Sequence, residues 1–508
     1  MAPAVAFLVP TLFIPISVDA YALPRATLTL AGGGLLMTAG LLVGRRPLGV
    51  LRGPVIAAVL AAVLAAAFSI APVVSLVGTY GRYESLPMRL AYVGLFCGAI
   101  WLGERERTTA AFLVGCAVAA VETLYQAWTH ALPRPDGNLG QPNLLGALLA
   151  MAIPIALDRA LRARSPASRI WLGLAALCGL ALAFSASRSG WLGALAGVCV
   201  LAIFAARPNR RRALIAVGTL AFTLAALLLV LSPLRMLNND PPSFRLGIWR
   251  DSLSVIAERP VTGWGEDTMG LVFGRHQSAD WVAGSNIDRA HSMPLDLAAT
   301  QGILGLAACA WLFGAWWLGM WRGRELSGSA GVAGAAAAYL ASVLLNFDWA
   351  PATAAFWLLA GAGWPGPGRA GEPAVQAWPE RSPIWINGVR VLAASTAALA
   401  GLVLAVVPMA ADLTYYARQP GVAAALDPWQ PRYQAAKGDL ASLRRAAALG
   451  DPDPSTYVTL GDAEAEAGHP EAAVGDYRQA LERYPYDVDA RQRLAPARSS
   501  ATRKAASG

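Results

Sequence analysis

Long runs of apolar residues limit what this chain can fold into more than any other feature. Thirteen such runs occur between residues 3 and 410, and about 20 apolar residues span a bilayer as one helix. Hydrophobic residues make up 56% of the 508 residues and charged residues only 14%, against roughly 25% charged in an average soluble domain. The pattern excludes a disordered chain and predicts an all-α, polytopic bundle of about 12–13 transmembrane helices.

The predicted spans follow the apolar runs, and several are shorter than the ideal length. The first run has no basic segment before it, so we expect a retained helix rather than a cleaved signal peptide. The spans are 3–18, 26–43, 55–77, 89–102, 109–128, 143–157, 170–187, 190–206, 213–232, 292–320, 328–346, 352–364 and 388–410.

Arginines alternate between rich and poor loops along the chain. The rich loops lie near 45–52, 105–107, 159–169, 207–212, 322–324 and 369–381. Because cytoplasmic loops carry the excess of basic residues, we expect these loops and the N-terminus on the cytoplasmic side. Thirteen crossings then place the C-terminus outside. The net charge of +9 is explained by these loops, so we predict no nucleic-acid partner.

Two hydrophilic pieces interrupt the apolar pattern. We expect a membrane domain at 1–410 that contains a large extracytoplasmic loop at 233–290. A small helical domain should follow at 411–496, on the same outer side, and a disordered tail at 497–508.

The helical domain shows the spacing of a tetratricopeptide unit. Small residues let two short helices pack closely, and a proline ends the second helix. One unit cannot bury both of its faces, so we expect it to pack on segment 428–449 or on the membrane domain. A generic helical hairpin is the alternative. The residues at this spacing are Tyr457, Leu460, Gly461, Ala473, Tyr477, Ala480 and Pro485.

Polar residues near the predicted outer helix ends form the candidate site, because charge at a membrane is costly and usually functional. Each has a structural alternative: a snorkelling arginine, turn-forming amides, a structural ion pair for Glu122, and a helix cap for Asp348. Chance would scatter them over both faces, whereas the topology places them on one. The set comprises Asn138, Gln141, Asn143, Arg188, Arg245, Arg250, His291, Asp348 and Glu122.

Segment 245–256 carries Leu246, Trp249, Leu253 and Ile256 at helical spacing. It predicts an amphipathic helix on the membrane surface, whose arginines either grip a phosphate or anchor in lipid headgroups. His291 stands just before Pro294, which suits a first helical turn. The positive end of the helix favours a neutral imidazole that accepts a proton; a loop histidine bonded to backbone is the alternative.

Three segments together resemble the O-antigen ligase superfamily, which also contains O-antigen polymerases and bacterial protein O-oligosaccharyltransferases. They are Phe244-Arg-Leu-Gly-Ile-Trp-Arg, Arg259-Pro-Val-Thr-Gly-Trp-Gly and Ala290-His-Ser through Gln301-Gly. The resemblance implies that Arg245 is the loop arginine and His291 the essential histidine. Arg188 matches a Ser-Arg-Ser turn, and Gly140-Gln-Pro-Asn resembles the oligosaccharyltransferase branch. Ser292, Gln301 and Asp348 depart from the usual Asn, Glu and Glu.

The resemblance implies a glycosyltransferase of the bacterial inner membrane. The donor is a glycan on a polyprenyl diphosphate, and the acceptor hydroxyl belongs to a lipid, glycan or protein. Arg188, Arg245 and Arg250 would bind the diphosphate while His291 takes the acceptor proton, with inversion. We expect no metal and no cofactor, the bilayer as a partner, and a protein partner at the repeat tail. The rivals are a transporter or flippase, which needs polar groups at the midplane, and a non-catalytic scaffold that displays its repeats.

Overall fold

The computed structural model describes residues 1–44, 46–204, 242–284, 286–366 and 384–507. Every regular element in these ranges is a helix, which confirms the predicted all-α fold. Seven described helices are long and apolar enough to cross a membrane, and five more are apolar with 10–17 residues. Twelve apolar helices are thus described, within the predicted range. The predicted span at 213–232 lies outside the described residues.

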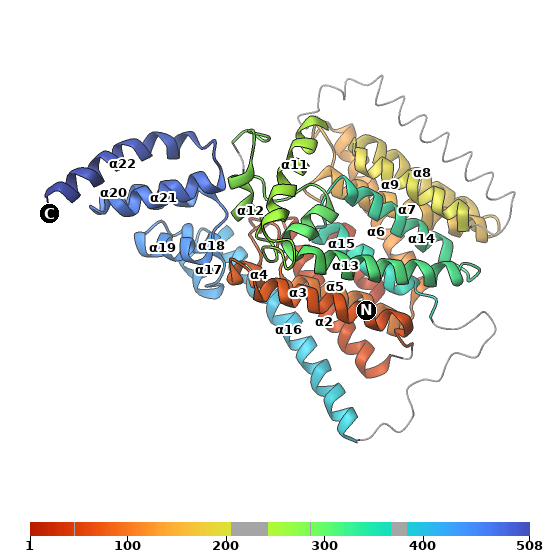
Figure 1. The fold of residues 1–508 in the computed structure, drawn as a ribbon. Coiled ribbons are helices and arrows are strands. Elements are labelled where there is room, and N and C mark those ends of the chain that lie inside the picture. Colours follow the sequence, from red (N-terminus) through yellow and green to blue (C-terminus); the bar gives the residue numbers. More distant parts are fainter. Residues whose placement is uncertain (45, 205–241, 285, 367–383, 508) are drawn as a thin grey trace.

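The bundle occupies one side of the molecule, and the C-terminal helices extend away from it (Figure 1). Its helices are α1 (Ala2–Thr11), α2 (Ala22–Val43), α3 (Arg52–Ala67), α4 (Pro72–Val77), α5 (Leu86–Leu102), α6 (Arg105–Trp128), α7 (Pro142–Arg162), α8 (Ala167–Ser185), α9 (Arg188–Phe204), α13 (Met293–Arg322), α14 (Ser329–Leu344), α15 (Ala350–Gly363) and α16 (Ile384–Tyr416).

Two predicted spans are wrong in extent because proline interrupts them. The run at 3–18 is helical only to Thr11, since Pro15 cannot donate a helical bond and disfavours helix at the residue before it. The run at 55–77 is two helices, because α3 ends at Ala67 and α4 starts at Pro72. The hydroxyl of Ser69 accepts from Ala71 N at 3.1 Å within this break.

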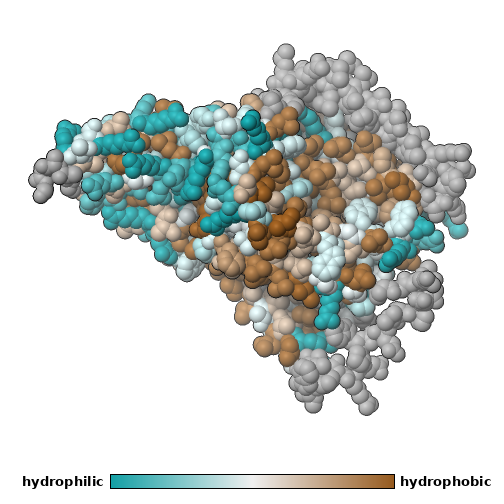
Figure 2. Space-filling view, viewed as in Figure 1, coloured by the Kyte–Doolittle hydropathy of each residue, from teal (hydrophilic) through white to brown (hydrophobic). Residues whose placement is uncertain are grey.

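Small residues set the closest helix packing of the bundle. A Cβ atom at Gly33 of α2 would collide with the backbone of Ala91 on α5, and one at Gly94 would collide with Gly33. Lipid supplies no hydrophobic force between membrane helices, so this close approach is where van der Waals attraction is gained. Brown, apolar residues accordingly cover the bundle surface, while teal residues dominate the C-terminal helices (Figure 2).

The chain between α9 and α13 contains α11 (Pro242–Glu258), α12 (Met269–Val272) and the short η3 (Phe273–His276). The helix predicted at 245–256 is confirmed as α11, but its apolar stripe is only partly correct. Leu246 and Leu253 are exposed, whereas Ile248 and Val255 are buried. The buried face packs on the loop that follows, so the two exposed leucines remain for contact with lipid.

Two of the sequence motifs pair with each other through their backbones. Helix α13 is broken at Gly302, whose φ is +65°, and residues 260–265 fill the break. Trp264 N donates to Ala299 O at 2.9 Å, and Gly265 N to Thr300 O at 3.0 Å. Ile303 N donates to Pro260 O at 2.8 Å. The break leaves backbone carbonyls and amides of α13 without helical partners, and residues 260–265 supply hydrogen bonds to them.

The C-terminal domain is built from α17 (Pro420–Leu426), α18 (Pro431–Ala435), α19 (Leu440–Leu449), α20 (Pro454–Glu466), α21 (Pro470–Arg483) and α22 (Val488–Ser507). Gly461 lies against the ring of Tyr477, as the repeat spacing predicts. The unit packs both on α19 and on the loop after α11. The expected disorder at 497–508 is wrong for the part that the structure describes, because α22 runs to Ser507; alanine and arginine there favour helix.

Candidate functional site

His291 lies two residues before the start of α13, as the sequence predicts, with a φ of +52°. Positive φ at a residue other than glycine is strained and recurs at functional sites. The three preceding residues are each tied down. Asp288 accepts two bonds from Arg82, at 2.6 and 3.1 Å. Arg289 is buried and paired with Asp267, and Ala290 N donates to Asp296 Oδ1 at 2.6 Å. The segment that presents His291 is therefore held by its neighbours.

Aromatic rings surround the imidazole and the nearest arginine. The ring of Phe347 lies edge-on to His291, with centroids 5.3 Å apart. The guanidinium of Arg82 lies over Phe347 at 4.7 Å and over Trp349 at 4.8 Å. Arg82 is thereby stacked on two rings and paired with Asp288, so that it stands as a fixed, partly exposed cation beside His291.

The turn between α14 and α15, residues 345–349, brings the predicted basic residues together. Arg245 of α11 donates to the carbonyl of Leu345, and Phe347 contacts His291. Near the end of α14, Ser342 Oγ donates to the carbonyl of Ser189 at 3.1 Å, next to Arg188. The starts of α9 and α13 and the side of α11 therefore converge on the same end of the bundle.

The predicted amides have structural partners at this end. Gln141 Oε1 caps α7 by accepting from Leu144 N at 3.0 Å, as a turn former would. Asn138 Oδ1 accepts from Gln126 Nε2 at 3.5 Å, and the backbone carbonyl of Asn138 accepts from Arg25 at 3.0 Å. Asn143 Oδ1 accepts from Arg134 at 3.3 Å, and Arg134 also donates to the carbonyls of Ser185 and Ala186. Arg134 thus joins the loop before α7 to the turn that carries Arg188.

Arg250 and Glu122 differ from the rest of the predicted set. Arg250 is exposed on α11, and no hydrogen bond or ion pair links it to the part of the chain that the structure describes. Its charge is available to a ligand. Glu122 is half-exposed on α6 and likewise has no such partner among the described residues. The structure does not join Glu122 to the cluster around His291.

Asp348 is buried in an ion-pair cluster that we did not predict. Arg89, near the start of α5, pairs with Asp348 and contacts Glu266 at 3.2 Å and Glu84 at 3.5 Å. Gln301 Nε2 donates to Glu266 Oε1 at 2.6 Å. One guanidinium thus joins the turn at 345–349, the loop after α11 and the break in α13. Asp348 holds this turn rather than capping α15, whose N-cap is Trp349.

Three carboxylates around one guanidinium do not ionise alike. Burial, only partly offset by Arg89, raises the pKa of Glu84 to about 8. Burial also raises the pKa of Glu266, although Arg89 and Gln301 lower it in part. Burial alone would raise the pKa of Asp348, but Arg89 and Arg289 outweigh it and hold that pKa below its usual value. Burial therefore favours the protonated form of Glu84, and the two arginines favour the ionised form of Asp348.

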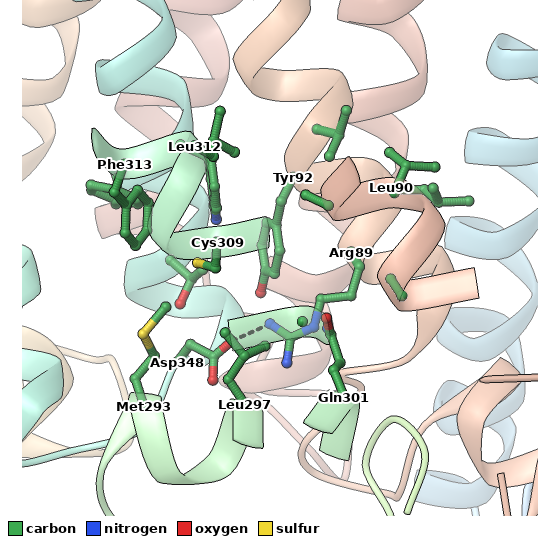
Figure 3. Close-up of a pocket in the computed structure, with 18 of the residues that line it drawn as sticks. Arg89, Leu90, Tyr92, Met293, Leu297, Gln301, Cys309, Leu312, Phe313 and Asp348 are labelled. Carbon is green, nitrogen blue, oxygen red and sulfur yellow. Dashed lines mark hydrogen bonds and ion pairs between the residues drawn. The ribbon is translucent and has the colours of Figure 1, made fainter. Parts of the chain in front are cut away.

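A small cavity borders this cluster (Figure 3). It measures about 70 Å³, and apolar side chains line its walls, among them Leu90, Leu297 and Phe313. Arg89 and Asp348 form its polar end.

The missed residues carried a partial signal in the sequence. Arg82, Glu84 and Arg89 fall within eight positions beside a predicted span, and charges so close to lipid are expected to be paired. Glu84 has its partners within eight positions, but the partners Asp288, Glu266 and Asp348 of the two arginines lie 177 to 259 positions away, so no local pattern reveals them. No three His, Cys, Asp or Glu side chains in the described ranges are grouped to hold a metal; the prediction of a metal-free reaction stays a prediction.

Comparisons with known proteins agree with the resemblance. Residues 173–310 match the family model of O-antigen ligases, and residues 454–497 match a tetratricopeptide repeat. The first range contains Arg188, Arg245 and His291. No curated protein and no solved structure matches the chain. The family match and the apolar helices indicate a multi-pass membrane enzyme that transfers glycans.

Proposed function

We propose that the chain transfers a glycan from a polyprenyl diphosphate to an acceptor hydroxyl at the end of the bundle where His291 lies. The observation that carries this proposal is the turn at 345–349, which contacts both Arg245 and His291. A general base and a cation for the leaving group are needed at once in such a transfer, and here one rigid turn supports both.

The reaction is a single displacement. The acceptor oxygen attacks the anomeric carbon while the bond from that carbon to the diphosphate oxygen breaks. His291 accepts the hydroxyl proton, and Arg188, Arg245 and Arg250 stabilise the charge that develops on the diphosphate. Arg82 adds a fourth cation beside the imidazole. One displacement inverts the configuration at the anomeric carbon, and polyprenyl diphosphate leaves.

The structure favours different roles for the remaining predicted residues. Asp348 is buried against Arg89, so we assign it the task of holding the turn rather than touching the donor. Asn143 and Gln141 shape the loop before α7. We retain them, with Asn138 and Glu122, as candidates for sugar contacts that variants must test.

The transporter alternative fits the positions of these groups less well. Arg188 begins α9, His291 precedes α13, and the turn at 345–349 joins two helices. All lie at helix ends, whereas a transporter needs its polar groups near the midplane. We propose that this end faces the outside of a bacterial inner membrane, with the arginine-rich loops in the cytoplasm.

Complementation of a strain that lacks the gene tests the proposal. Surface glycolipids and secreted proteins are measured by mass spectrometry with His291→Ala, Arg188→Ala and Arg245→Ala, each normalised to the amount of folded protein in the membrane. We expect glycan transfer to fall at least 100-fold, the scale on which a general base acts. Arg322→Ala, at the opposite end of α13, is the matched control and should transfer normally. Wild-type transfer by His291→Ala would disprove the mechanism.

The repeat domain separates this proposal from the scaffold alternative. A scaffold would lose its function when residues 411–508 are removed and keep it in His291→Ala. The enzyme must lose its function in His291→Ala whatever the state of the repeats. A protein partner of the repeats remains part of the proposal, since tetratricopeptide surfaces bind other chains.

A further inference from the structure

An open hollow of about 800 Å³ lies at the end of the bundle opposite His291. Helix α7 begins beside the candidate site and ends at Arg162 on the hollow, while α14 starts beside the hollow and ends near the turn at 345–349. The 21 residues of α7 rise about 30 Å, the thickness of a bilayer core. The hollow and the candidate site therefore belong to opposite membrane surfaces.

Arginines dominate the charged lining of the hollow. Four arginines and two glutamates line it, which leaves an excess of two positive charges: Arg46, Arg105, Arg107, Arg162, Glu104 and Glu106. Glu106 forms ion pairs with Arg159 at 2.9 Å and with Arg162 at 3.5 Å. Glu104 has one loose contact, at 3.8 Å to Arg107. Asp158, which does not line the hollow, pairs with Arg162 at 3.0 Å. The positive charge left uncompensated therefore lies mainly on Arg46, Arg105 and Arg107.

Two of these arginines keep donors free within the described part of the chain. Arg46 is exposed and has no hydrogen bond or ion pair to the described residues. The two terminal nitrogens of Arg105 donate to the carbonyls of Ser327 and Gly363, at 2.7 and 2.8 Å. Its Nε atom is buried and has no hydrogen-bond partner among the described residues. Buried donors normally have partners, so this Nε is an unusual feature of the hollow.

The start of α6 adds to the positive potential of the same hollow. This 24-residue helix begins at Arg105, and the N-terminus of a helix presents free amides and the positive end of its dipole. Gly103 has a φ of +68°, and a Cβ there would lie 2.6 Å from Nε of Arg46. The glycine therefore leaves room for the Arg46 guanidinium beside the start of the helix.

Exposed apolar side chains flank Arg46 in the chain, within four residues on either side. Leu42 and Val43, at the end of α2 just before Arg46, are exposed by 48% and 66%. Val50, just after it, is exposed by 61%. A group that enters the hollow from the bilayer would place acyl chains on these residues and its phosphate among the arginines.

We propose that this hollow binds the phosphate of an anionic phospholipid from the leaflet opposite the candidate site. The forked guanidinium groups of Arg46 and Arg107 grip the phosphate oxygens, and the α6 amides complete the site. The lipid ties the segment between α2 and α3 to the start of α6. This inference does not depend on glycan transfer.

Native mass spectrometry of the full chain in detergent tests the proposal. Phosphatidylglycerol, phosphatidylcholine and inorganic phosphate are titrated separately. The test variant is Arg46→Gln with Arg107→Gln, two exposed side chains of the hollow. The matched control is Arg52→Gln with Arg322→Gln, two exposed arginines at the same end of the bundle that do not line it. Thermal unfolding in the same detergent checks that both proteins fold.

We expect wild-type protein and the control to bind one phosphatidylglycerol each. The test variant should bind it about 30-fold more weakly, because each of the two arginines contributes about fivefold. Phosphatidylcholine should bind the wild-type protein no more tightly than phosphatidylglycerol binds the test variant. An equal loss in the control would mean diffuse surface attraction and overturn the proposal. Binding of inorganic phosphate without phosphatidylglycerol would overturn it as well, because the ligand would then be a soluble anion.

Discussion

The ring of Phe347 stands edge-on to the imidazole of His291, with an angle of 73° between their planes. The same ring carries the guanidinium of Arg82 on its face, and Arg82 grips Asp288, three residues before His291. A continuous series of contacts therefore links His291, Phe347, Arg82 and Asp288. Phe347 belongs to a turn that Arg89 holds through Asp348, so the position of His291 depends on contacts across the whole site.

Replacing Phe347 with leucine should reduce transfer far more than stability. Leucine keeps most of the buried volume, so the loss in stability should stay below about 1.5 kcal/mol. It removes the ring that positions His291 and Arg82, and we expect transfer to fall about tenfold. Complementation and thermal unfolding measure the two effects. Phe68→Leu, at an exposed ring, serves as the control; equal transfer by both variants would show that the ring does not position His291.

Stability should fall as pH rises because Glu84 is protonated in the folded chain. Its folded pKa is about 8 against a usual value of 4.5, so the folded state binds the proton more tightly than the unfolded state. The stabilisation is complete below pH 4.5 and is lost as pH rises to 8. We expect the unfolding temperature in detergent to fall by roughly 5 °C between pH 5 and 8. Glu266, whose pKa is also raised, adds to the same slope.

Glu84→Gln isolates this contribution, because glutamine mimics the protonated acid. The variant should lose the part of the pH slope that Glu84 contributes, keep the part that Glu266 contributes, and keep the neutral-pH stability. Glu325→Gln, an exposed carboxylate at the other end of the bundle, should keep the full slope. An unchanged slope in Glu84→Gln would show that this carboxyl is ionised in the folded protein.

How far the sequence predicts this molecule depends on the range of the interactions involved. Apolar runs predict the bundle helices, because a lipid-facing helix needs no distant partner to be recognised. The prediction of His291 and Arg245 as site residues rests on motifs whose residues are close in sequence. Arg89 was missed because its partners Glu266 and Asp348 lie 177 and 259 positions away. The break at Gly302 was missed for a similar reason, since residues 260–265 supply its hydrogen bonds.

The C-terminal domain should stabilise the loop that leads to His291. Tyr484 Oη accepts from Gly284 N at 2.7 Å and contacts Asp280 at 3.0 Å. Gly274 lies so close to the backbone of Glu482 and Arg483 that a Cβ would collide with both. We expect Gly274→Ala to separate the two parts, to speed proteolysis of segment 277–290 and to lower transfer about tenfold.

Gly475→Ala is the matched control for that variant. It lies on α21 of the same domain, and a Cβ there meets open space. Its proteolysis and transfer should equal those of the wild type. If Gly274→Ala behaved like Gly475→Ala, the docking of the domain would have no part in ordering the loop.

Gly302 should be the least replaceable glycine of α13. Its φ of +65° disfavours any L side chain, and a Cβ would collide with the Val261 carbonyl. Gly302→Ala should therefore displace residues 260–265, break the bonds to Ala299 and Thr300, and lower the free energy of unfolding by about 1–3 kcal/mol. Gly314→Ala, on the same helix in open space, should be neutral or slightly stabilising. The midpoints of thermal unfolding of both variants, measured in one detergent, test this difference in stability. Equal midpoints would mean that α13 straightens without cost, and the loop motif would then not depend on the break.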